Sequence, residues 1–239
     1  MIEKTLTYEA DGKKLVSTLY RKDPIASAPA IIVFPDIRGL GDHARERAAR
    51  LAELGYIALA ADLHGEAELI PPETVMSVLD GFYAHVAGPL ERGRASLAAL
   101  CGEPGVDSTR IGAMGFCYGG TLALELARSG ADLAAVVGFH SALATTIAVE
   151  PGGIRAKVLA CIGAEDPIVP PNDRARFEEE MRQAKVDWRL HLYGGVLHSF
   201  TDWRADLANL PGFAKYDASA DRQSWIAMAD LFQEVFGPN

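Results

Sequence analysis

Residues 111–128 of the chain read IGAMGFCYGGTLALELAR, and this stretch decides the fold. An apolar segment, 111–114, runs into Gly115-Phe116-Cys117-Tyr118-Gly119-Gly120, and apolar residues at helical spacing follow. The glycines around Cys117 fit the G-x-S-x-G pattern with cysteine in place of serine, a sharp turn that exposes its central side chain. The stretch therefore predicts a strand, a tight turn and a helix, with Cys117 at the turn.

Apolar runs of strand length recur on both sides of this stretch, and helical patterns separate them. The runs cover 30–34, 57–61, 134–139, 158–162 and, with more alternation, 188–193; the helical patterns cover 44–54, 90–100, 119–128, 173–184 and 221–236. Residues 5–8 and 14–20 flank Asp11-Gly12, the turn pair of a β-hairpin. Because strands that alternate with helices form βα units, we predict an α/β fold with a mostly parallel central sheet and helices on both faces. Nothing in 1–239 reads as a linker, so a single domain is expected.

Composition and charge exclude several classes of protein. The chain has 239 residues, 49% of them hydrophobic, and a formal net charge of -9. This charge would repel a phosphate backbone and no Lys/Arg-rich stripe offsets it, so nucleic acid is not an expected partner. The start lacks the basic-then-apolar order of a secretory signal, and no stretch reaches the ~18 apolar residues of a membrane span. We therefore expect a cytoplasmic protein without membrane contact.

Three cysteines, Cys101, Cys117 and Cys161, are each interpreted as a lone thiol. They form no CxxC pair and cannot all be bridged, so neither a disulfide framework nor a cysteine-based zinc site is expected. Cys117 differs from the other two because its turn opens a helix, whose positive N-terminal end favours the nucleophilic thiolate. An inert, buried thiol in a glycine-rich turn is the alternative interpretation.

A thiolate nucleophile needs a base and a group that orients the base, and after this kind of turn the chain order is nucleophile, acid, histidine. Asp166 and its neighbour Glu165 both follow the predicted strand 158–162, and either could instead be a turn carboxylate. His198 stands in a glycine-rich loop after the predicted strand 188–193. The remaining histidines lack this context and are interpreted as surface or core residues: His43, His64, His85, His140 and His191.

These residues predict acyl transfer. The carboxylate would fix the tautomer of the imidazole, which exchanges a proton with the thiol and then with the leaving alcohol. Attack gives a tetrahedral oxyanion and then a thioester that water hydrolyses. The oxyanion needs two preorganised donors, which we expect to be the N–H groups of Tyr118 and of Ile37 in the loop after the third strand.

Taken together, these segments resemble the dienelactone hydrolase family (carboxymethylenebutenolidases) of the α/β-hydrolase superfamily. The resemblance rests on 36–39 (Asp-Ile-Arg-Gly), the 115–120 turn, 163–166 (Gly-Ala-Glu-Asp) and 197–200 (Leu-His-Ser-Phe), and it extends from about the third strand to the last helix. It implies an α/β-hydrolase fold and a cofactor-independent Cys-Asp-His triad, here Cys117, Asp166 and His198, that opens small esters or lactones. It also favours Asp166 over Glu165 as the acid.

Two departures from the family bear on the substrate. A glutamate that hydrogen-bonds the resting thiol in characterised members is replaced by Asp36, one methylene shorter, so Asp36 is a candidate thiol-modulating residue with a capping carboxylate as the alternative. The family's carboxylate-binding arginines have no counterpart, since 201–203 read Thr-Asp-Trp and no arginine lies between Met76 and Pro89. Dienelactone itself is therefore not a safe substrate assignment.

Two irregular segments, 66–88 and 201–216, are expected to wall the substrate pocket, because loops at the ends of parallel strands bind ligands. The candidate substrate-binding residues are Arg38, Phe82, Tyr83 and Trp203; the aromatic ones suit an apolar group, although core packing explains them equally well. We expect a small-molecule ester or lactone as partner, no metal or cofactor, and a monomer or small homo-oligomer. The main rival is a non-hydrolytic, thiol-reactive or ligand-binding protein of the same fold, modified at Cys117 without turnover.

Overall fold

One sheet of eight strands organises the part of the chain that this computed structural model describes, residues 1–23 and 27–237 without the side chain of Tyr83. The strands are β1 (Ile2–Ala10), β2 (Lys13–Arg21), β3 (Ala28–Phe34), β4 (Ile57–Ala60), β5 (Val106–Phe116), β6 (Ala135–Phe139), β7 (Lys157–Gly163) and β8 (Trp188–Tyr193). Their order across the sheet is β1-β2-β4-β3-β5-β6-β7-β8. β1 and β2 pair antiparallel with their neighbours, whereas β3 to β8 run parallel, so the predicted fold class is confirmed.

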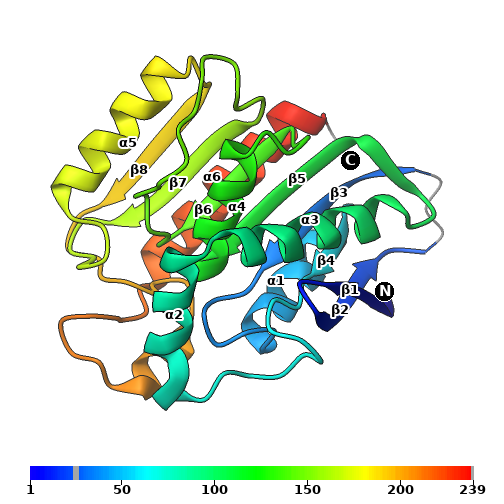
Figure 1. Cartoon of the computed structure of the whole chain (residues 1–239), viewed down its shortest axis with the longest axis horizontal. Helices are drawn as coiled ribbons and strands as arrows, with labels where there is room; N and C mark the ends of the chain where they lie inside the picture. The colour runs from blue at the N-terminus through cyan, green and yellow to red at the C-terminus, as the bar shows by residue number, and fades with distance from the viewer. Residues whose placement is uncertain (24–26, 238–239) are drawn as a thin grey trace.

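Helices cover both faces of this sheet (Figure 1). They are α1 (Asp42–Glu53), α2 (Val75–Ala84), α3 (Ala87–Cys101), α4 (Tyr118–Arg128), α5 (Pro171–Gln183) and α6 (Ala218–Phe236), with short 3-10 helices η1 (Pro72–Thr74) and η2 (Trp203–Ala208). One apolar core lies under α3, α4 and α5 and a second under α1 and α6. Alternate residues of β3 feed the two cores, Ile32 into the first and Ile31 into the second. A strand buried on both faces explains the continuous apolar runs in the sequence.

The predicted hairpin is present at one edge of the sheet. Asp11 and Gly12 both have positive φ, 50° and 65°, which lets a two-residue turn match the twist of β1 and β2. The irregular segment 66–88 contains helix α2, which tolerates Gly81 in its interior. Among the described residues, no helix is long and apolar enough to cross a membrane.

The carboxyl ends of the parallel strands bring the predicted reactive residues to one edge of the sheet. Cys117 follows β5 directly, and the loops after β3, β7 and β8 carry Asp36, Asp166 and His198. In a sheet of this kind, ligands bind outside these strand ends. The topology therefore assembles residues that lie far apart in the sequence.

Candidate active site

Cys117 occupies a strained turn between β5 and α4. Its backbone has φ 50° and ψ -117°, and the partly exposed residue caps the N-terminus of α4. The flanking glycines are required by close backbone approach: a Cβ on Gly119 would lie 2.2 Å from the Pro35 oxygen, and one on Gly115 would lie 2.3 Å from the Gly119 carbonyl carbon. Positive φ at a residue other than glycine costs free energy and persists at functional sites. The predicted sharp turn is present, with the thiol at its apex.

The structure brings Asp166 and His198 into direct contact. Asp166 Oδ2 lies 2.8 Å from His198 Nδ1, and its other oxygen accepts the Ile168 N–H at 2.9 Å. Both side chains are buried, whereas Glu165 is exposed. A Cβ on Gly163 would lie 2.3 Å from the Val196 oxygen, so a glycine is needed where the two loops meet. Asp166, rather than Glu165, is the carboxylate placed to orient the imidazole.

The second nitrogen of His198 faces the thiol. His198 Nε2 is buried and has no partner of ordinary hydrogen-bond geometry in the described chain. Burial opposes the imidazolium, but the charge of the neighbouring Cys117 and the hydrogen bond with Asp166 outweigh it and raise the pKa of His198 to about 10. The raised pKa keeps His198 protonated at neutral pH, as a cation beside the Cys117 side chain.

The loop after β3 lies against the start of α4. Asp36 accepts the Arg38 N–H at 2.7 Å, and the Ile37 oxygen lies 3.0 Å from His64 Nε2, which together fix the turn that carries Ile37. Burial raises the pKa of Asp36 and the nearby Asp202 carboxylate raises it further. Asp36 therefore sits beside other charged groups of the site, and its described hydrogen bond goes to its own loop.

The four candidate substrate-binding residues have different surroundings. Arg38 is exposed and donates from Nε to the Ile70 oxygen at 2.8 Å, and Trp203 is 54% exposed. Phe82 is only 4% exposed and packs edge-on against Tyr118, with ring centroids 4.8 Å apart, so it supports the turn from behind. Tyr83 belongs to α2, but its side chain lies outside the described residues.

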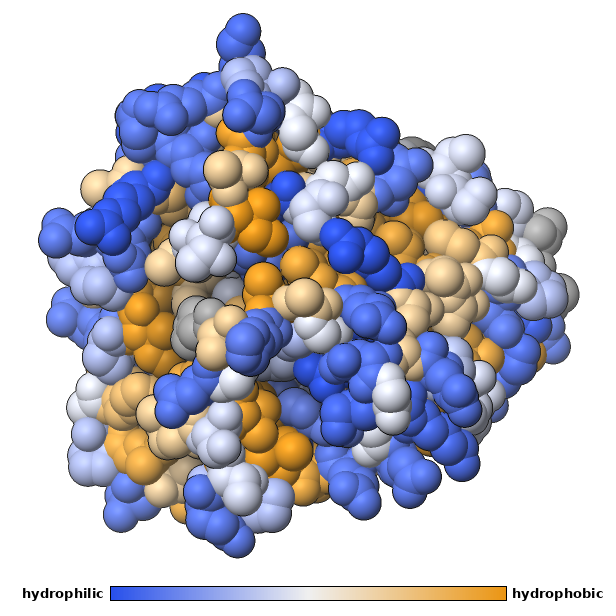
Figure 2. All heavy atoms as spheres, viewed as in Figure 1, coloured by the Kyte–Doolittle hydropathy of each residue, from blue (hydrophilic) through white to orange (hydrophobic). Residues whose placement is uncertain are grey.

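An exposed apolar residue of the irregular segment 201–216 lies next to His198. The Phe213 ring lies 5.6 Å from the imidazole, is 39% exposed, and Phe213 accepts the His198 backbone N–H at 3.1 Å. The irregular segments 66–88 and 201–216 have further exposed apolar side chains: Leu69, Met76, Trp203, Leu207 and Leu210. Figure 2 shows apolar surface over α2 and the segment around η2. This part of the surface is therefore more apolar than charged.

Two buried residues beneath the site were missed in the sequence. His140 Nδ1 accepts the backbone N–H of Cys117 at 3.2 Å, and its Nε2 lies 2.8 Å from the Thr201 hydroxyl. The His140 ring lies 5.0 Å from the His198 ring. The available signal was position: His140 directly follows β6, the neighbour of β5, so it ends at the same edge as Cys117.

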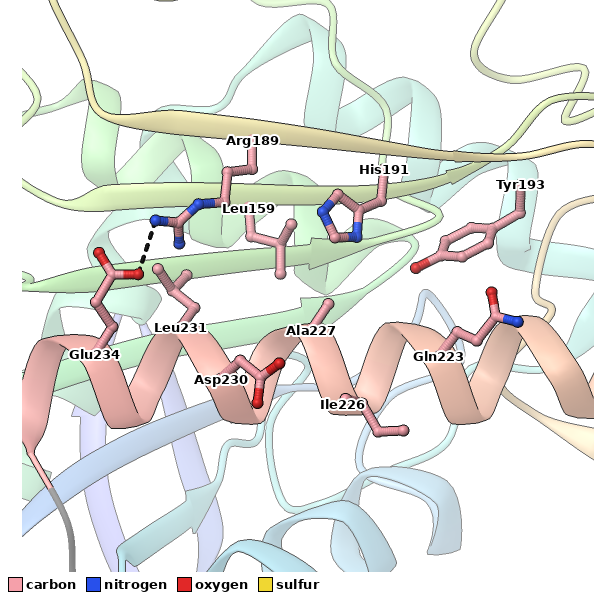
Figure 3. Close-up of a pocket in the computed structure, with 10 residues that line it drawn as sticks. All are labelled: Leu159, Arg189, His191, Tyr193, Gln223, Ile226, Ala227, Asp230, Leu231 and Glu234. Atoms are coloured by element: carbon pink, nitrogen blue, oxygen red, sulfur yellow. Dashed lines mark hydrogen bonds and ion pairs between the residues drawn. The ribbon is translucent and has the colours of Figure 1, made fainter.

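A separate groove of about 460 Å³ lies between β8 and α6 (Figure 3). His191 and Tyr193 project into it from β8, and Arg189 pairs with Glu234 of α6 across one end at 2.7 Å. No residue of the Cys117, Asp166 and His198 group lines it. This groove therefore plays no part in the site described above.

Comparison with known proteins agrees with this architecture. The model of the dienelactone hydrolase family matches residues 16–236. A crystal structure described as the dienelactone hydrolase-like promiscuous phosphotriesterase P91, from metagenomic libraries, is 40% identical, covers 99% of both chains and superposes with a TM-score of 0.91. A structure described as m3DLH is 44% identical over 98% of both chains, with a TM-score of 0.92. A Bradyrhizobium protein described as a probable 2-oxo-3-(5-oxofuran-2-ylidene)propanoate lactonase is 29% identical over 202 residues, 80% of each chain.

The family match covers nearly the whole sheet and all the strand ends that carry the reactive residues. The resemblance seen in the sequence is therefore confirmed, and hydrolysis of ester or lactone bonds is the activity class that goes with it. The chain belongs to the dienelactone hydrolase family, with an α/β-hydrolase fold.

Proposed function

We propose that the protein hydrolyses a small carboxylic ester or lactone with Cys117 as nucleophile, His198 as general acid and base, and Asp166 as the group that orients the imidazole. The observation that carries this proposal is the buried pair of Asp166 and His198, 2.8 Å apart, beside a thiol on a strained turn, with the second imidazole nitrogen unpartnered in the described chain. Such an arrangement pairs a nucleophile with a base that a third group holds in place.

The proposed reaction has two halves. The Cys117 thiolate attacks the carbonyl carbon, and the tetrahedral oxyanion accepts hydrogen bonds from the N–H groups of Tyr118 and Ile37. The imidazolium of His198 gives its proton to the leaving alcohol as the thioester forms. Water then attacks the thioester while His198 takes a proton, and the carboxylic acid leaves with the thiolate regenerated.

The surroundings of the site favour an uncharged substrate. The carboxyl groups of Asp36 and Asp202 lie near His198 and disfavour a further carboxylate on the substrate. Arg204 is engaged by Asp202 at 3.1 Å and by Glu46 at 2.7 Å, which leaves Arg38 as the cation at the loop after β3. Esters without a carboxylate are therefore the proposed substrates, and Asp36 is proposed to tune the thiol through its charge.

A second candidate activity is hydrolysis of neutral phosphotriesters. The phosphotriesterase P91 is 40% identical to this chain over 99% of both. A phosphotriester is uncharged, as the carboxylates at the site require, and it presents an electrophilic centre and a developing oxyanion to the same groups. We propose it as a side activity of the same thiol.

A substrate panel tests both activities. Short p-nitrophenyl esters and lactones, with and without a carboxylate, and a p-nitrophenyl phosphotriester are assayed on the wild type and on Cys117→Ala, with Cys101→Ala as the matched thiol control. Because no other group replaces the nucleophile, Cys117→Ala should lower kcat by at least about 1000-fold. Cys101→Ala should keep wild-type rates.

Mass spectrometry of the quenched reaction locates the intermediate. An acyl group on the Cys117 peptide supports the thioester route. An acyl group on Cys101 or Cys161 contradicts the assignment of the nucleophile. Modification of Cys117 without turnover of any panel member would establish the thiol-reactive, non-hydrolytic alternative.

A further inference from the structure

His140 lies at the junction of the two segments that carry the thiol and the imidazole. It directly follows β6, is buried, and has φ 40°, so both it and Cys117 adopt the left-handed region that side chains other than glycine rarely occupy. Its backbone N–H continues the ladder to the Cys161 oxygen at 2.8 Å. An unusual backbone at a buried histidine beside a reactive centre calls for a functional explanation.

The hydrogen bonds of His140 define its tautomer. The Cys117 backbone N–H is a donor, shared between the Phe139 oxygen at 3.0 Å and His140 Nδ1 at 3.2 Å, so Nδ1 must be an acceptor. The proton therefore sits on Nε2, which donates to the Thr201 hydroxyl at 2.8 Å. A protonated His140 would lose the bond to Cys117.

The neutral form of His140 is held by its surroundings. Burial lowers the pKa of His140 well below the ordinary value, and the neighbouring His198, His43 and Arg47 act in the same direction. His140 thus remains a neutral acceptor toward Cys117 at neutral pH.

Thr201 extends this connection to the segment that carries His198, three residues earlier in the chain. Its carbonyl oxygen accepts a hydrogen bond from Arg47 of α1 and lies 3.1 Å from His43 Nε2, so the residue is fixed from the opposite side as well. The path Cys117 N–H, His140 ring, Thr201 hydroxyl therefore joins the backbone of the thiol residue to the loop of the imidazole.

We propose that His140 is a positioning residue, which holds the Cys117 turn and the His198 loop at the separation that proton transfer between thiol and imidazole requires. The inference rests on the proposed function of Cys117 and His198. A rigid imidazole with hydrogen bonds at both nitrogens fixes this separation better than apolar packing, because each bond is directional. Misplacement of reacting groups by about 1 Å can cost about 100-fold in rate.

Thr201 offers the cleanest test, because valine matches the shape of threonine without the hydroxyl, whereas serine keeps the hydroxyl and loses only a methyl group. Thr201→Val removes the acceptor for His140, and Thr201→Ser retains it. We expect Thr201→Val to lower kcat by about 10-fold with KM unchanged, and Thr201→Ser to stay within about 2-fold of the wild type. His140→Phe, which removes both bonds, should lower kcat by about 100-fold. In His140→Phe with Thr201→Val, kcat should match His140→Phe alone, since the contact is already lost.

Alkylation of Cys117 by iodoacetamide supplies a readout that does not depend on turnover. In a Cys101→Ala background, the rate of alkylation against pH reports the thiolate that the His198 imidazolium stabilises. Thr201→Val should react more slowly at neutral pH and reach half its maximal rate at a higher pH, and Thr201→Ser should follow the wild type.

The outcomes separate this inference from the proposed function. Absence of ester turnover by the wild type would overturn the proposed function, while the alkylation profiles would still test His140. The inference is wrong if Thr201→Val and Thr201→Ser have the same kcat, normalised to the amount of reactive Cys117 thiol, and the same dependence of alkylation rate on pH. A difference in thermal unfolding alone would make His140 a structural residue.

Discussion

Two regions next to the reactive centre differ in polarity and burial. Beneath the thiol lies a buried polar floor of His43, Arg47, His140 and Thr201, in which every member hydrogen-bonds another. On the surface of the segment that packs against His198 lies an apolar rim of Trp203, Leu210 and Phe213, all exposed. Directional bonds fix positions to a fraction of an ångström, whereas exposed apolar side chains offer area without a fixed geometry.

From this difference we expect the buried floor to control the rate of the chemical step and the exposed rim to control which substrate binds. Buried polar groups are costly unless each one is paired, so the floor has few alternative arrangements and keeps the reacting atoms in place. The rim carries no such constraint and can change without loss of the fold. Changes at the triad and floor should therefore alter kcat and stability, and changes at the rim should alter KM.

The largest effect is expected at Asp166, the carboxylate that holds His198. Asp166→Asn keeps the shape of the side chain but replaces the acceptor that holds His198 Nδ1–H, so the wrong tautomer is favoured, and kcat should fall by about 10000-fold. The carboxylate also contributes to the raised pKa of His198, about 10 in the wild type. Because the imidazolium is the acid, wild-type activity should be lost as pH rises through about 10, and in Asp166→Asn this loss should begin at a lower pH.

A pH–rate profile of both proteins measures this shift. Glu165→Gln is the matched control, since Glu165 is the exposed neighbour and should keep both the rate and the alkaline limit. An unchanged alkaline limit in Asp166→Asn would show that Asp166 does not set the protonation of His198. Equal losses in the two variants would assign the orienting role to neither carboxylate.

The next effect concerns stability of the floor. Arg47 is 8% exposed and pairs with Asp221 of α6 at 2.8 Å, while it also donates to the Thr201 carbonyl. Arg47→Met keeps the apolar stem but leaves a partly buried carboxylate and a carbonyl without their partner, so the free energy of unfolding should fall by about 3 kcal/mol. Urea unfolding followed by circular dichroism measures the change.

Arg182→Met is the control for Arg47→Met. Arg182 pairs with Glu179 at 3.0 Å on the surface of α5, with both side chains 55% exposed. An exposed pair contributes between 0 and about 1 kcal/mol, so this variant should unfold near the wild-type midpoint. Equal losses in the two variants would mean that the floor is no better ordered than the surface.

The same contrast explains how much could be predicted from the sequence. Strand runs and the glycine turn are local patterns, and the sequence places them within a few residues of where the structure has them. The catalytic roles of Cys117, Asp166 and His198 stay a prediction. His140 and Thr201 carry no local pattern, because their partners lie on neighbouring strands and loops. Placing His140 required the order β5-β6-β7 across the sheet, which only the pairing of strands provides. Figure 1 shows β5, β6 and β7 side by side; because they run parallel, their carboxyl ends lie at the same end of the sheet.

Close backbone contacts and the burial of side chains could not be predicted from the sequence. Gly163 stands in the Gly-Ala-Glu-Asp segment of the sequence, but the need for a glycine there comes from the Val196 oxygen, a contact between two loops. Phe82 and Trp203 looked alike as aromatic candidates, and burial distinguishes them: Phe82 is 4% exposed and Trp203 is 54% exposed. Exposure of an aromatic depends on the packing of neighbouring elements, so the sequence alone could not rank them.

The smallest effects are expected at the rim. Phe213 touches the His198 ring but is 39% exposed, so Phe213→Ala removes part of an apolar surface without opening the core. If the Phe213 ring contributes about 1 kcal/mol of contact with an aryl ester, its removal should raise KM for that ester about 5-fold. KM for a short alkyl acetate, which has no aryl group, should stay at the wild-type value. Leu207 is 73% exposed, so Leu207→Ala serves as control and should leave both KM values within about 2-fold. Should Phe213→Ala lower kcat for both esters and leave KM unchanged, Phe213 would act on His198 rather than on the substrate, and the rim would share the role of the floor.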